Sequence, residues 1–143
     1  MFKTNEKDCK KIEYVALYCR VASGNTEASN QEIAAQKAKL VDWAKQQGYS
    51  SEQMVILVDD GFSGLTLDRP GLQQVFSGNR SYAMLVAVNF SRFGRDLSLV
   101  ARLVDYAEAQ GTTVYALKEQ TSLNQWKRER DQFFRTFLKG GCR

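Results

Sequence analysis

The sequence predicts an α/β fold in which a mainly parallel sheet lies between two layers of helices and a long helix closes the chain. Short apolar runs of strand length alternate with longer segments of helical periodicity. This β-α-β-α-β-α-β-α order is typical of a parallel sheet covered by helices on both faces. The length of 143 residues, with 43% hydrophobic and 25% charged residues, fits one compact domain that buries its own core.

The strands are predicted from continuous apolar runs, which indicate strands buried on both faces. These runs are residues 14–18, 54–58, 83–88 and 113–117. The helices expected between them cover residues 32–47, 70–76 and 97–109. Gly48 and Gly111 provide stop signals for the first and third helices, and Pro70, the only proline, suits a helix start. A last helix is predicted over 126–138, with its phenylalanines on one side.

Three segments are expected along the chain: an N-terminal tail (1–12), the α/β domain (13–125) and a basic C-terminal helix and tail (126–143). No apolar run approaches the roughly 20 residues that a membrane-spanning helix needs. The N-terminal tail also lacks the apolar stretch of a signal peptide. A cytoplasmic protein without membrane contact is therefore expected.

Cysteine and histidine usage limits the possible chemistry. The cysteines, Cys9, Cys19 and Cys142, form no CxxC pair, and the chain contains no histidine. We therefore expect neither a metal site nor a disulfide framework, and the roles of the cysteines stay unassigned. The absence of histidine also excludes Ser-His and Cys-His catalytic pairs.

The net charge of +4 is concentrated at the C-terminal end. Residues 1–60 hold eight basic and nine acidic side chains, whereas residues 126–143 hold six basic and two acidic ones. A basic arm on a near-neutral domain indicates contact with a polyanion such as nucleic acid. A solvated helix face explains the same charges equally well.

Ligands of open α/β sheets bind beyond the carboxyl ends of the strands, so the loops after the first three strands form the candidate site. These loops contain arginines, serines and acids: Arg20, Arg69, Arg92, Arg95, Ser23, Ser63, Ser91, Asp59, Asp60 and Asp68. Guanidinium groups bind phosphate oxygens in pairs, and a serine hydroxyl among them is a candidate nucleophile for phosphoryl transfer. Because no GxxxxGK[ST] loop is present, a nucleoside triphosphate is not the expected ligand.

Purely structural interpretations exist for the same residues. The serines, taken singly, are better explained as helix caps or turn residues, and Asp59 and Asp60 as ion-pair partners of Arg69. Arg92 and Arg95 precede a helix, where their charge opposes the helix dipole, which favours a functional role. The combination of residues, rather than any one of them, is specific.

Five stretches occur at the expected places: Tyr18–Val21, Gln36 with Leu40, Asp60–Gly64, Asp68–Leu72 and Ser91–Asp96. In this order they resemble the serine recombinase family, which comprises resolvases, invertases and large serine integrases. The resemblance covers about residues 13–139. It implies a resolvase-like catalytic domain whose serine attacks a DNA phosphodiester, forms a 5′-phosphoserine link and frees a 3′-hydroxyl, with no metal or other cofactor.

The resemblance also assigns roles by position. The residues expected around the scissile phosphate are Arg20, Arg69, Arg92 and Arg95, and those expected to support the site are Asp60, Ser63, Gln36 and Ser91. The partners it implies are double-stranded DNA and copies of the same chain, as a dimer on each site and a tetramer in synapsis.

The resemblance matches the C-terminal helix to a helix that dimerises through an apolar face and runs toward the DNA. The side chains expected at the DNA are Arg128, Arg130, Arg135 and Lys139. A separate DNA-binding domain is expected beyond Arg143, because this arm offers few base-reading side chains. The alternative is that the helix packs only on its own domain.

The chain departs from the family at the nucleophile. The family usually has Arg-Val-Ser, whereas this chain has Ala22 at the serine position and Ser23 one residue later. In one interpretation Ser23 is a shifted nucleophile, which we favour because a loop followed by Gly24 absorbs such a shift. In the other, the chain is a catalytically inactive DNA-binding or assembly module. Ser63 and Ser91 are weaker nucleophile candidates.

A third hypothesis belongs to another functional class. A flavodoxin-like domain that binds a small phosphorylated ligand has the same order of elements. It predicts a concave apolar pocket, and a flat basic face argues against it.

Overall fold

The computed structural model describes residues 12–22, 24, 26–78 and 80–141, with side chains as far as residue 136. The strands are β1 (Tyr14–Val21), β2 (Met54–Asp60), β3 (Tyr82–Ala87), β4 (Thr113–Ala116) and β5 (Thr121–Ser122). The α-helices are α2 (Glu27–Gln46), α3 (Pro70–Gln73), α4 (Leu97–Ala109) and α5 (Leu123–Gly141). Short 3₁₀ turns are η1 (Ser51–Gln53), η2 (Gln74–Phe76) and η3 (Phe90–Arg92).

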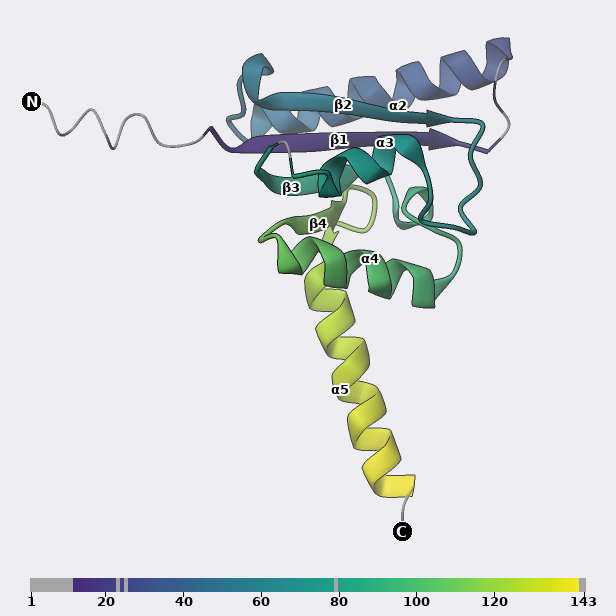
Figure 1. Ribbon diagram of the computed structural model, residues 1–143, viewed down its shortest axis with the longest axis vertical. Helices are drawn as coiled ribbons and strands as arrows, with labels where there is room; N and C mark the ends of the chain where they lie inside the picture. The colour runs from purple at the N-terminus through teal and green to yellow at the C-terminus, as the bar shows by residue number, and fades with distance from the viewer. Residues whose placement is uncertain (1–11, 23, 25, 79, 142–143) are drawn as a thin grey trace, which may run out of the picture.

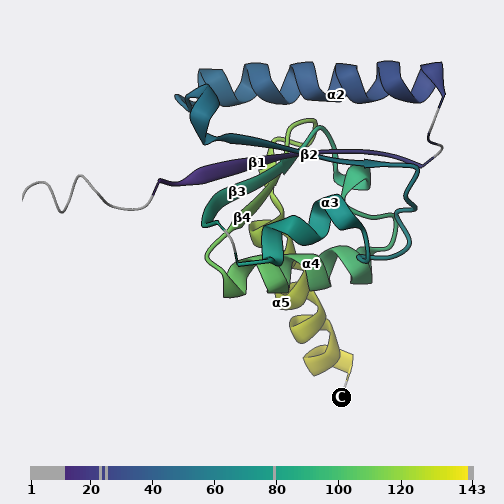
Figure 2. The same ribbon diagram turned by 45° about the horizontal axis from the view of Figure 1, so that its top comes forward.

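The described strands form one sheet in the order β2-β1-β3-β4-β5. β1 to β4 are parallel to their neighbours, and β5 pairs antiparallel with β4. Helix α2 covers one face of the sheet, whereas α3 and α4 cover the other (Figure 2). The structure thus confirms the predicted three-layer α/β fold with a long C-terminal helix.

Strand β1 is the centre of the core. From Val15 to Val21 every residue of β1 is buried. Its side chains alternate between two apolar clusters: Val15 and Leu17 meet Leu40 of α2 on one face, and Ala16 and Tyr18 join the cluster under α3 and α4 on the other. Burial on both faces is why the run is continuously apolar instead of alternating.

Two strands are longer than predicted, and this corrects the placement of site residues. β1 continues to Val21 and β2 to Asp60, with Arg20 opposite Asp59 in the parallel ladder. Arg20, Asp59 and Asp60 are therefore strand residues and not loop residues. The apolar runs end earlier than the strands because the last strand positions carry charged side chains that are held by buried polar contacts.

The helices also differ from the prediction at their ends. Helix α2 begins at Glu27 rather than Glu32, because Thr26 caps it: the Thr26 hydroxyl oxygen accepts from the Ser29 backbone N–H at 3.0 Å. The exposed first turns of α2 have no apolar stripe, so periodicity missed them. The predicted helix 70–76 is α3 followed by the 3₁₀ turn η2, while α4 matches the prediction. Strand β5 was not predicted.

Helix α5 projects from the body of the domain (Figure 1). Its first turns are anchored: the Asn124 side chain accepts from the Val114 backbone N–H at 2.8 Å, and the Trp126 ring meets the Phe90 ring edge-on at 5.1 Å. Farther along, Phe133 and Phe134 are 63% and 46% exposed. The start of the helix therefore packs on its own domain, whereas dimerisation and DNA contact through the rest of it stay predictions.

Among the described residues, no helix is long and apolar enough to cross a membrane.

Candidate active site

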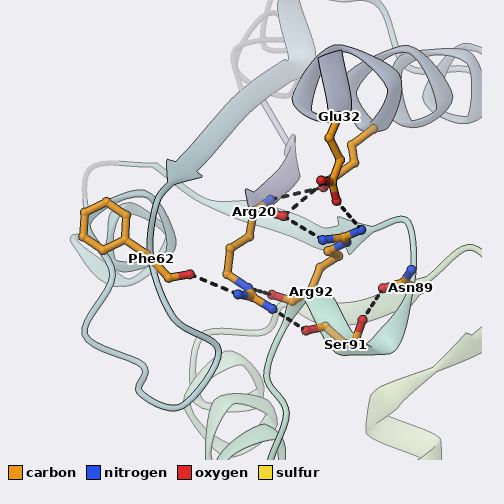
Figure 3. A network of polar contacts seen from close by, with 7 residues as sticks. Arg20, Glu32, Phe62, Asn89, Ser91 and Arg92 are labelled. Atoms are coloured by element: carbon orange, nitrogen blue, oxygen red, sulfur yellow. Dashed lines mark hydrogen bonds and ion pairs between the residues drawn. The ribbon is translucent and has the colours of Figure 1, made fainter. Parts of the chain in front are cut away.

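Arg20 joins the loops that follow β2 and β3. Its side chain is almost fully buried, and its guanidinium donates hydrogen bonds to three backbone carbonyls (Figure 3). The acceptors and distances are Phe62 (3.0 Å), Ser91 (2.8 Å) and Arg92 (3.0 Å). Burial, with a smaller contribution from the charge of Arg69, lowers the pKa of Arg20 below its ordinary value.

Gln36 of α2 fixes the backbone of Arg20. The Gln36 side-chain oxygen accepts from the Arg20 backbone N–H at 3.1 Å, and the Gln36 amide nitrogen donates to the Arg20 carbonyl at 3.1 Å. These two hydrogen bonds connect helix α2 to the end of β1. Strand β2, which pairs with β1, ends at the same edge of the sheet. The predicted supporting residue Gln36 therefore lies within the arginine cluster.

Arg69 is fully buried and also binds backbone carbonyls. Its guanidinium donates to the carbonyls of Thr66 at 2.8 Å and Arg92 at 3.1 Å, and to that of Phe93. It also donates to the Tyr18 hydroxyl at 2.9 Å. The loop that carries Arg92 is thus held from beneath by two buried arginines, Arg20 and Arg69.

A buried tyrosine links Arg69 to Asp59. The Tyr18 hydroxyl donates to the Asp59 carboxylate at 2.7 Å, and burial raises the pKa of Tyr18 well above its ordinary value. The same carboxylate accepts from the backbone N–H groups of Gly71 (2.6 Å) and Leu72 (3.0 Å), at the start of α3. Asp59 is therefore joined to Arg69 through Tyr18, and no direct ion pair between them is seen.

Arg92 and Arg95 are the arginines that reach solvent. The Arg92 side chain is 23% exposed, and it donates to the Arg20 carbonyl at 3.0 Å and forms an ion pair with Glu32 at 2.8 Å. The Arg92 Nε is buried and has no hydrogen-bond partner among the described residues. Arg95 is exposed, and its backbone N–H is bound by the Gly64 carbonyl at 3.0 Å. Ser91, Arg95 and Lys118 line one polar groove on this surface.

Two glycines allow the close approach of the site segments. A Cβ on Gly24 would lie 2.6 Å from the Asp60 carboxylate oxygen Oδ1 and 2.8 Å from the Gly61 backbone nitrogen. A Cβ on Gly64 would lie 2.9 Å from the Arg20 guanidinium. The Asp60 Oδ1 is buried and has no hydrogen-bond partner within the described part of the chain. Asp60 therefore presents an unsatisfied acceptor beside Gly24.

The candidate nucleophiles differ in their surroundings. Ser23 lies outside the described residues. The Ser63 hydroxyl accepts from the Leu65 backbone N–H at 3.0 Å, and the Ser91 hydroxyl donates to the Asn89 side chain at 2.8 Å. Both contacts are with residues two positions away, which is the turn-stabilising role that the sequence favours for single serines.

Cys19 is a buried free thiol next to Arg20 in β1. Burial raises the pKa of Cys19 to about 11, so the thiolate is not available at neutral pH. Cys9 and Cys142 lie outside the described residues. Within the described ranges, no three His, Cys, Asp or Glu side chains gather as metal ligands.

The basic side chains of α5 have local partners. Arg128 lies 3.5 Å from the Glu108 carboxylate, and Arg135 donates to Gln132 at 3.1 Å. The Arg130 guanidinium lies over the rings of Trp126 (5.8 Å) and Phe134 (5.6 Å). The Lys139 side chain is outside the described part.

A hollow elsewhere on the surface tests the small-ligand hypothesis. It lies between the 65–68 loop and α4 and is lined in part by Leu65, Phe76, Leu99 and Tyr106. None of the four clustered arginines lines it. The hollows that Arg92 and Arg95 line are separate ones, shared with Val88 and Leu117 for Arg92 and with Phe90 and Leu97 for Arg95.

Sequence reasoning missed Glu32 and Tyr18 as members of the site. Glu32 precedes Gln36 by one helical turn, so the two share one face of α2, and that spacing was the available signal. Tyr18 lies in an apolar strand run and gave no signal of its polar role.

Solved structures with this fold include serine recombinase catalytic domains. The N-terminal catalytic domain of TP901-1 integrase superposes with a TM-score of 0.72 at 22% identity, covering 88% of this chain and 99% of that one. A resolvase family site-specific recombinase from Streptococcus pneumoniae superposes with a TM-score of 0.64 at 19% identity, covering 91% and 95%. At these identities the likeness concerns the fold. No curated protein matches the chain in sequence.

The family comparison covers nearly the whole described chain. Residues 15–141 match the family described as "Resolvase, N terminal domain". The match includes β1 from Val15 onward with Arg20, the arginine loops and the whole of α5. The chain therefore belongs to the resolvase family, as an N-terminal catalytic domain of the serine recombinase type.

Proposed function

We propose that this domain cuts and rejoins DNA through a 5′-phosphoserine intermediate, with Ser23 as the nucleophile. The observation that carries the proposal is the pair Arg92 and Arg95, presented to solvent by a loop that two buried arginines hold in place. Fixed donors aimed at one oxyanion site are what phosphoryl transfer requires, because positioning and charge stabilisation supply most of its catalysis.

The proposed step breaks one phosphodiester bond and forms another. The Ser23 oxygen loses its proton and bonds to phosphorus, while the bond from phosphorus to the 3′-oxygen breaks and the 3′-oxygen takes up a proton. Arg92 and Arg95 stabilise the charge on the non-bridging oxygens. The reverse attack by a 3′-hydroxyl restores the DNA and frees Ser23, so no external energy source or cofactor enters the balance.

Arg20 and Arg69 act in this proposal mainly by positioning. Every guanidinium nitrogen of Arg20 donates to a carbonyl, and Arg69 has no solvent exposure. For Arg20 or Arg69 to contact the phosphate directly, its guanidinium has to break hydrogen bonds to the backbone carbonyls that it now binds. Their expected place around the phosphate stays a prediction.

The end of β1 supports the shifted nucleophile. β1 ends at Val21, so Ala22 lies beyond the strand ladder. A one-residue shift within a strand would turn the side chain to the other face, whereas a shift beyond its end leaves the ladder unchanged. Gly24 lies against Asp60, which leaves the unsatisfied Asp60 oxygen at the same loop.

Helix α5 is proposed as the assembly and DNA-contact element. Its exposed Phe133 and Phe134 suit a second copy of the chain, because large apolar side chains gathered on a projecting helix gain from burial. The residues proposed at the DNA backbone are Arg128, Arg130, Arg135 and Lys139. A dimer on each site, a tetramer in synapsis and a further DNA-binding domain beyond Arg143 complete the proposal.

Covalent trapping tests the chemistry. The full protein is incubated with duplex DNA from the flanks of its own gene and denatured, and any protein–DNA adduct is mapped by mass spectrometry. Ser23→Ala is the test variant, and Ser63→Ala and Ser91→Ala are matched controls. We expect a phosphopeptide at Ser23 that Ser23→Ala alone abolishes.

Other outcomes discriminate the alternatives. An adduct at Ser63 or Ser91 retains the enzyme and overturns Ser23 as the nucleophile. DNA binding and pairing without any adduct favours the inactive DNA-binding module, for which Ala22 at the family's serine position is the motivating observation.

A further inference from the structure

The Glu32 carboxylate binds Arg92, a residue that the proposed function assigns to the DNA phosphate. Glu32 forms an ion pair with Arg92, with 2.8 Å between Glu32 Oε2 and Arg92 Nη2 (Figure 3). Carboxylate and phosphate oxygens use the same donors of a guanidinium. An anion that approaches Arg92 therefore meets a donor that is already occupied.

The geometry of α2 brings Glu32 to this point. Gln36, one turn farther along α2, is fixed by its two hydrogen bonds to the Arg20 backbone. Residues four apart lie on the same face of a helix, so Glu32 is directed toward the same strand end as Gln36. The Arg20 carbonyl accepts from both Gln36 and Arg92, which joins the two contacts.

Arg92 does not need Glu32 to hold it in place. Its Nη1 donates to the Arg20 carbonyl, and its own carbonyl accepts from Arg20 and Arg69. Its Nε is buried and has no hydrogen-bond partner in the described part of the chain, so the contact with Glu32 leaves the guanidinium partly unsatisfied. Glu32 contacts Arg92 through one carboxylate oxygen. A ligand that presents more acceptor oxygens can accept hydrogen bonds from more of the Arg92 N–H groups.

Glu32 can also leave. Its side chain is 45% exposed, and ion pairs at this level of exposure are weak because water and salt compete with them. The contact is therefore reversible, and the phosphates of a docked DNA duplex, each with one negative charge and two non-bridging oxygens, can displace it.

We propose that Glu32 is an internal competitor of the DNA phosphate: it occupies Arg92 while the site is empty and is displaced when DNA binds. This inference rests on the proposed function, in which Arg92 contacts phosphate. Its consequence is a site that discriminates against weakly held anions. Because Glu32 occupies Arg92, the site has a lower affinity for every anion. DNA, which also binds through other contacts, compensates for this lower affinity.

A double-mutant cycle tests this inference. Binding of a fluorescent DNA duplex of arbitrary sequence is measured at low salt for the unmodified chain, Glu32→Gln, Arg92→Ala and the double variant. Glu27→Gln is the matched control, because it removes the same charge from the first turn of α2 and Glu27 has no ion pair among the described residues. Thermal unfolding of each variant verifies that it is folded.

We expect Glu32→Gln to tighten DNA binding about three- to tenfold. The gain combines the free energy of a partly exposed ion pair with relief of the repulsion between the Glu32 charge and the DNA. Glu27→Gln should change affinity by less than about twofold. The gain from Glu32→Gln should fall to the size of the Glu27→Gln effect when Arg92 is alanine, since the competitor then has no target.

The outcomes separate this inference from the proposed function. If Arg92→Ala leaves DNA binding unchanged, Arg92 is not a phosphate ligand, and both ideas are overturned. If Arg92→Ala weakens binding but Glu32→Gln and Glu27→Gln behave alike, the phosphate site stands and the competitor is rejected. A gain from Glu32→Gln that persists with Arg92→Ala also rejects the competitor, because it reflects net charge alone.

Glu32→Asp is a second variant that preserves the net charge. Its carboxylate is one methylene shorter, so the contact with Arg92 is weakened without loss of the negative charge. Competition by contact predicts a gain in affinity for Glu32→Asp, whereas an effect of overall charge predicts none. No gain from this variant would limit the role of Glu32 to its charge and overturn the displacement step.

Discussion

The inner and outer arginines of the cluster have the same chemistry and different partners. Arg20 and Arg69 are buried and use their donors on backbone carbonyls of loops that come from distant parts of the chain. Arg92 and Arg95 lie on the loop that those two hold, and they reach solvent. The inner pair therefore supports structure, whereas the outer pair is the one that faces solvent.

The difference teaches how a cationic site can be rigid without carboxylates at every arginine. A carbonyl accepts a charged hydrogen bond but does not neutralise the guanidinium, so the cluster keeps its positive charge. Fixed positive charge suits an oxyanion that arrives later. Substitution of Arg20 or Arg69 should therefore mainly lower stability, whereas substitution of Arg92 or Arg95 should mainly weaken DNA binding.

Arg69→Met is expected to have the largest effect on stability. It leaves the carbonyls of Thr66, Arg92 and Phe93 without their donor and removes the partner of the Tyr18 hydroxyl. Loss of one partner from a buried charged network costs about 3–5 kcal/mol. Urea unfolding measures this cost, with the exposed Arg102→Met as the control. If Arg69→Met unfolds at the same urea concentration as Arg102→Met, the inner arginines are not structural.

The burial of β1 predicts a loss of stability at high pH. The pKa of Cys19 is raised from 9.0 to about 11 in the folded chain. The stability contributed by the neutral thiol is therefore complete below pH 9 and is lost as the pH rises to 11, by about 2–3 kcal/mol. Urea unfolding from pH 8 to 11 measures the decline, and Cys19→Ala should make it shallower. The raised pKa of Tyr18 acts in the same direction, so part of the decline should remain. An identical pH dependence for Cys19→Ala would show that Cys19 is accessible.

Gly64→Ala is expected to disturb the connection between the inner and outer pairs. The new methyl group would lie 2.9 Å from Arg20 Nη2 and 3.1 Å from Arg95 Cγ. The guanidinium has to shift away from the Ser91 carbonyl, at a cost of about 1–3 kcal/mol. The neighbouring Ser63→Ala should cost less than about 0.5 kcal/mol. Equal stabilities of the two variants, measured by urea unfolding, would mean that this contact is loose.

Arg95→Met is expected to change stability least and to change DNA binding clearly. Its side chain is exposed, so the free energy of unfolding should change by less than about 0.5 kcal/mol. If Arg95 contacts one phosphate, the slope of log binding constant against log salt should fall in magnitude by about one. Anisotropy titrations over a range of salt concentrations measure the slope. An unchanged slope would remove Arg95 from the phosphate contacts.

Much of the fold was predictable because the apolar residues of the core recur in the sequence at the spacing of strands and helices. Helix α4 matches its predicted bounds, since its apolar stripe runs to both ends of the helix. The start of α2 was missed because its first turns are polar and its cap uses Thr26 with Ser29. The ends of β1 and β2 were missed because their charged residues interrupt the apolar runs that marked the strands.

The clustering of the four arginines was predictable from the sequence, whereas their contacts were not. The end of β1 and the loops after β2 and β3 do bring Arg20, Arg69, Arg92 and Arg95 into one region. Which arginines face solvent depends on where backbone carbonyls lie, and a sequence pattern contains no information about carbonyl positions. For the same reason the ion pair with Glu32 became visible only in three dimensions.

The Arg92 carbonyl accepts from Arg20 and Arg69 together, and this shared acceptor has a consequence for cooperativity. A segment anchored at one carbonyl by two core residues cannot open locally without exposing both of them. The loop of Arg92 therefore belongs to the same unfolding unit as β1 and the start of α3. Its amide hydrogens should therefore exchange with solvent as slowly as those of the sheet, so the Arg92 loop persists as long as the folded domain.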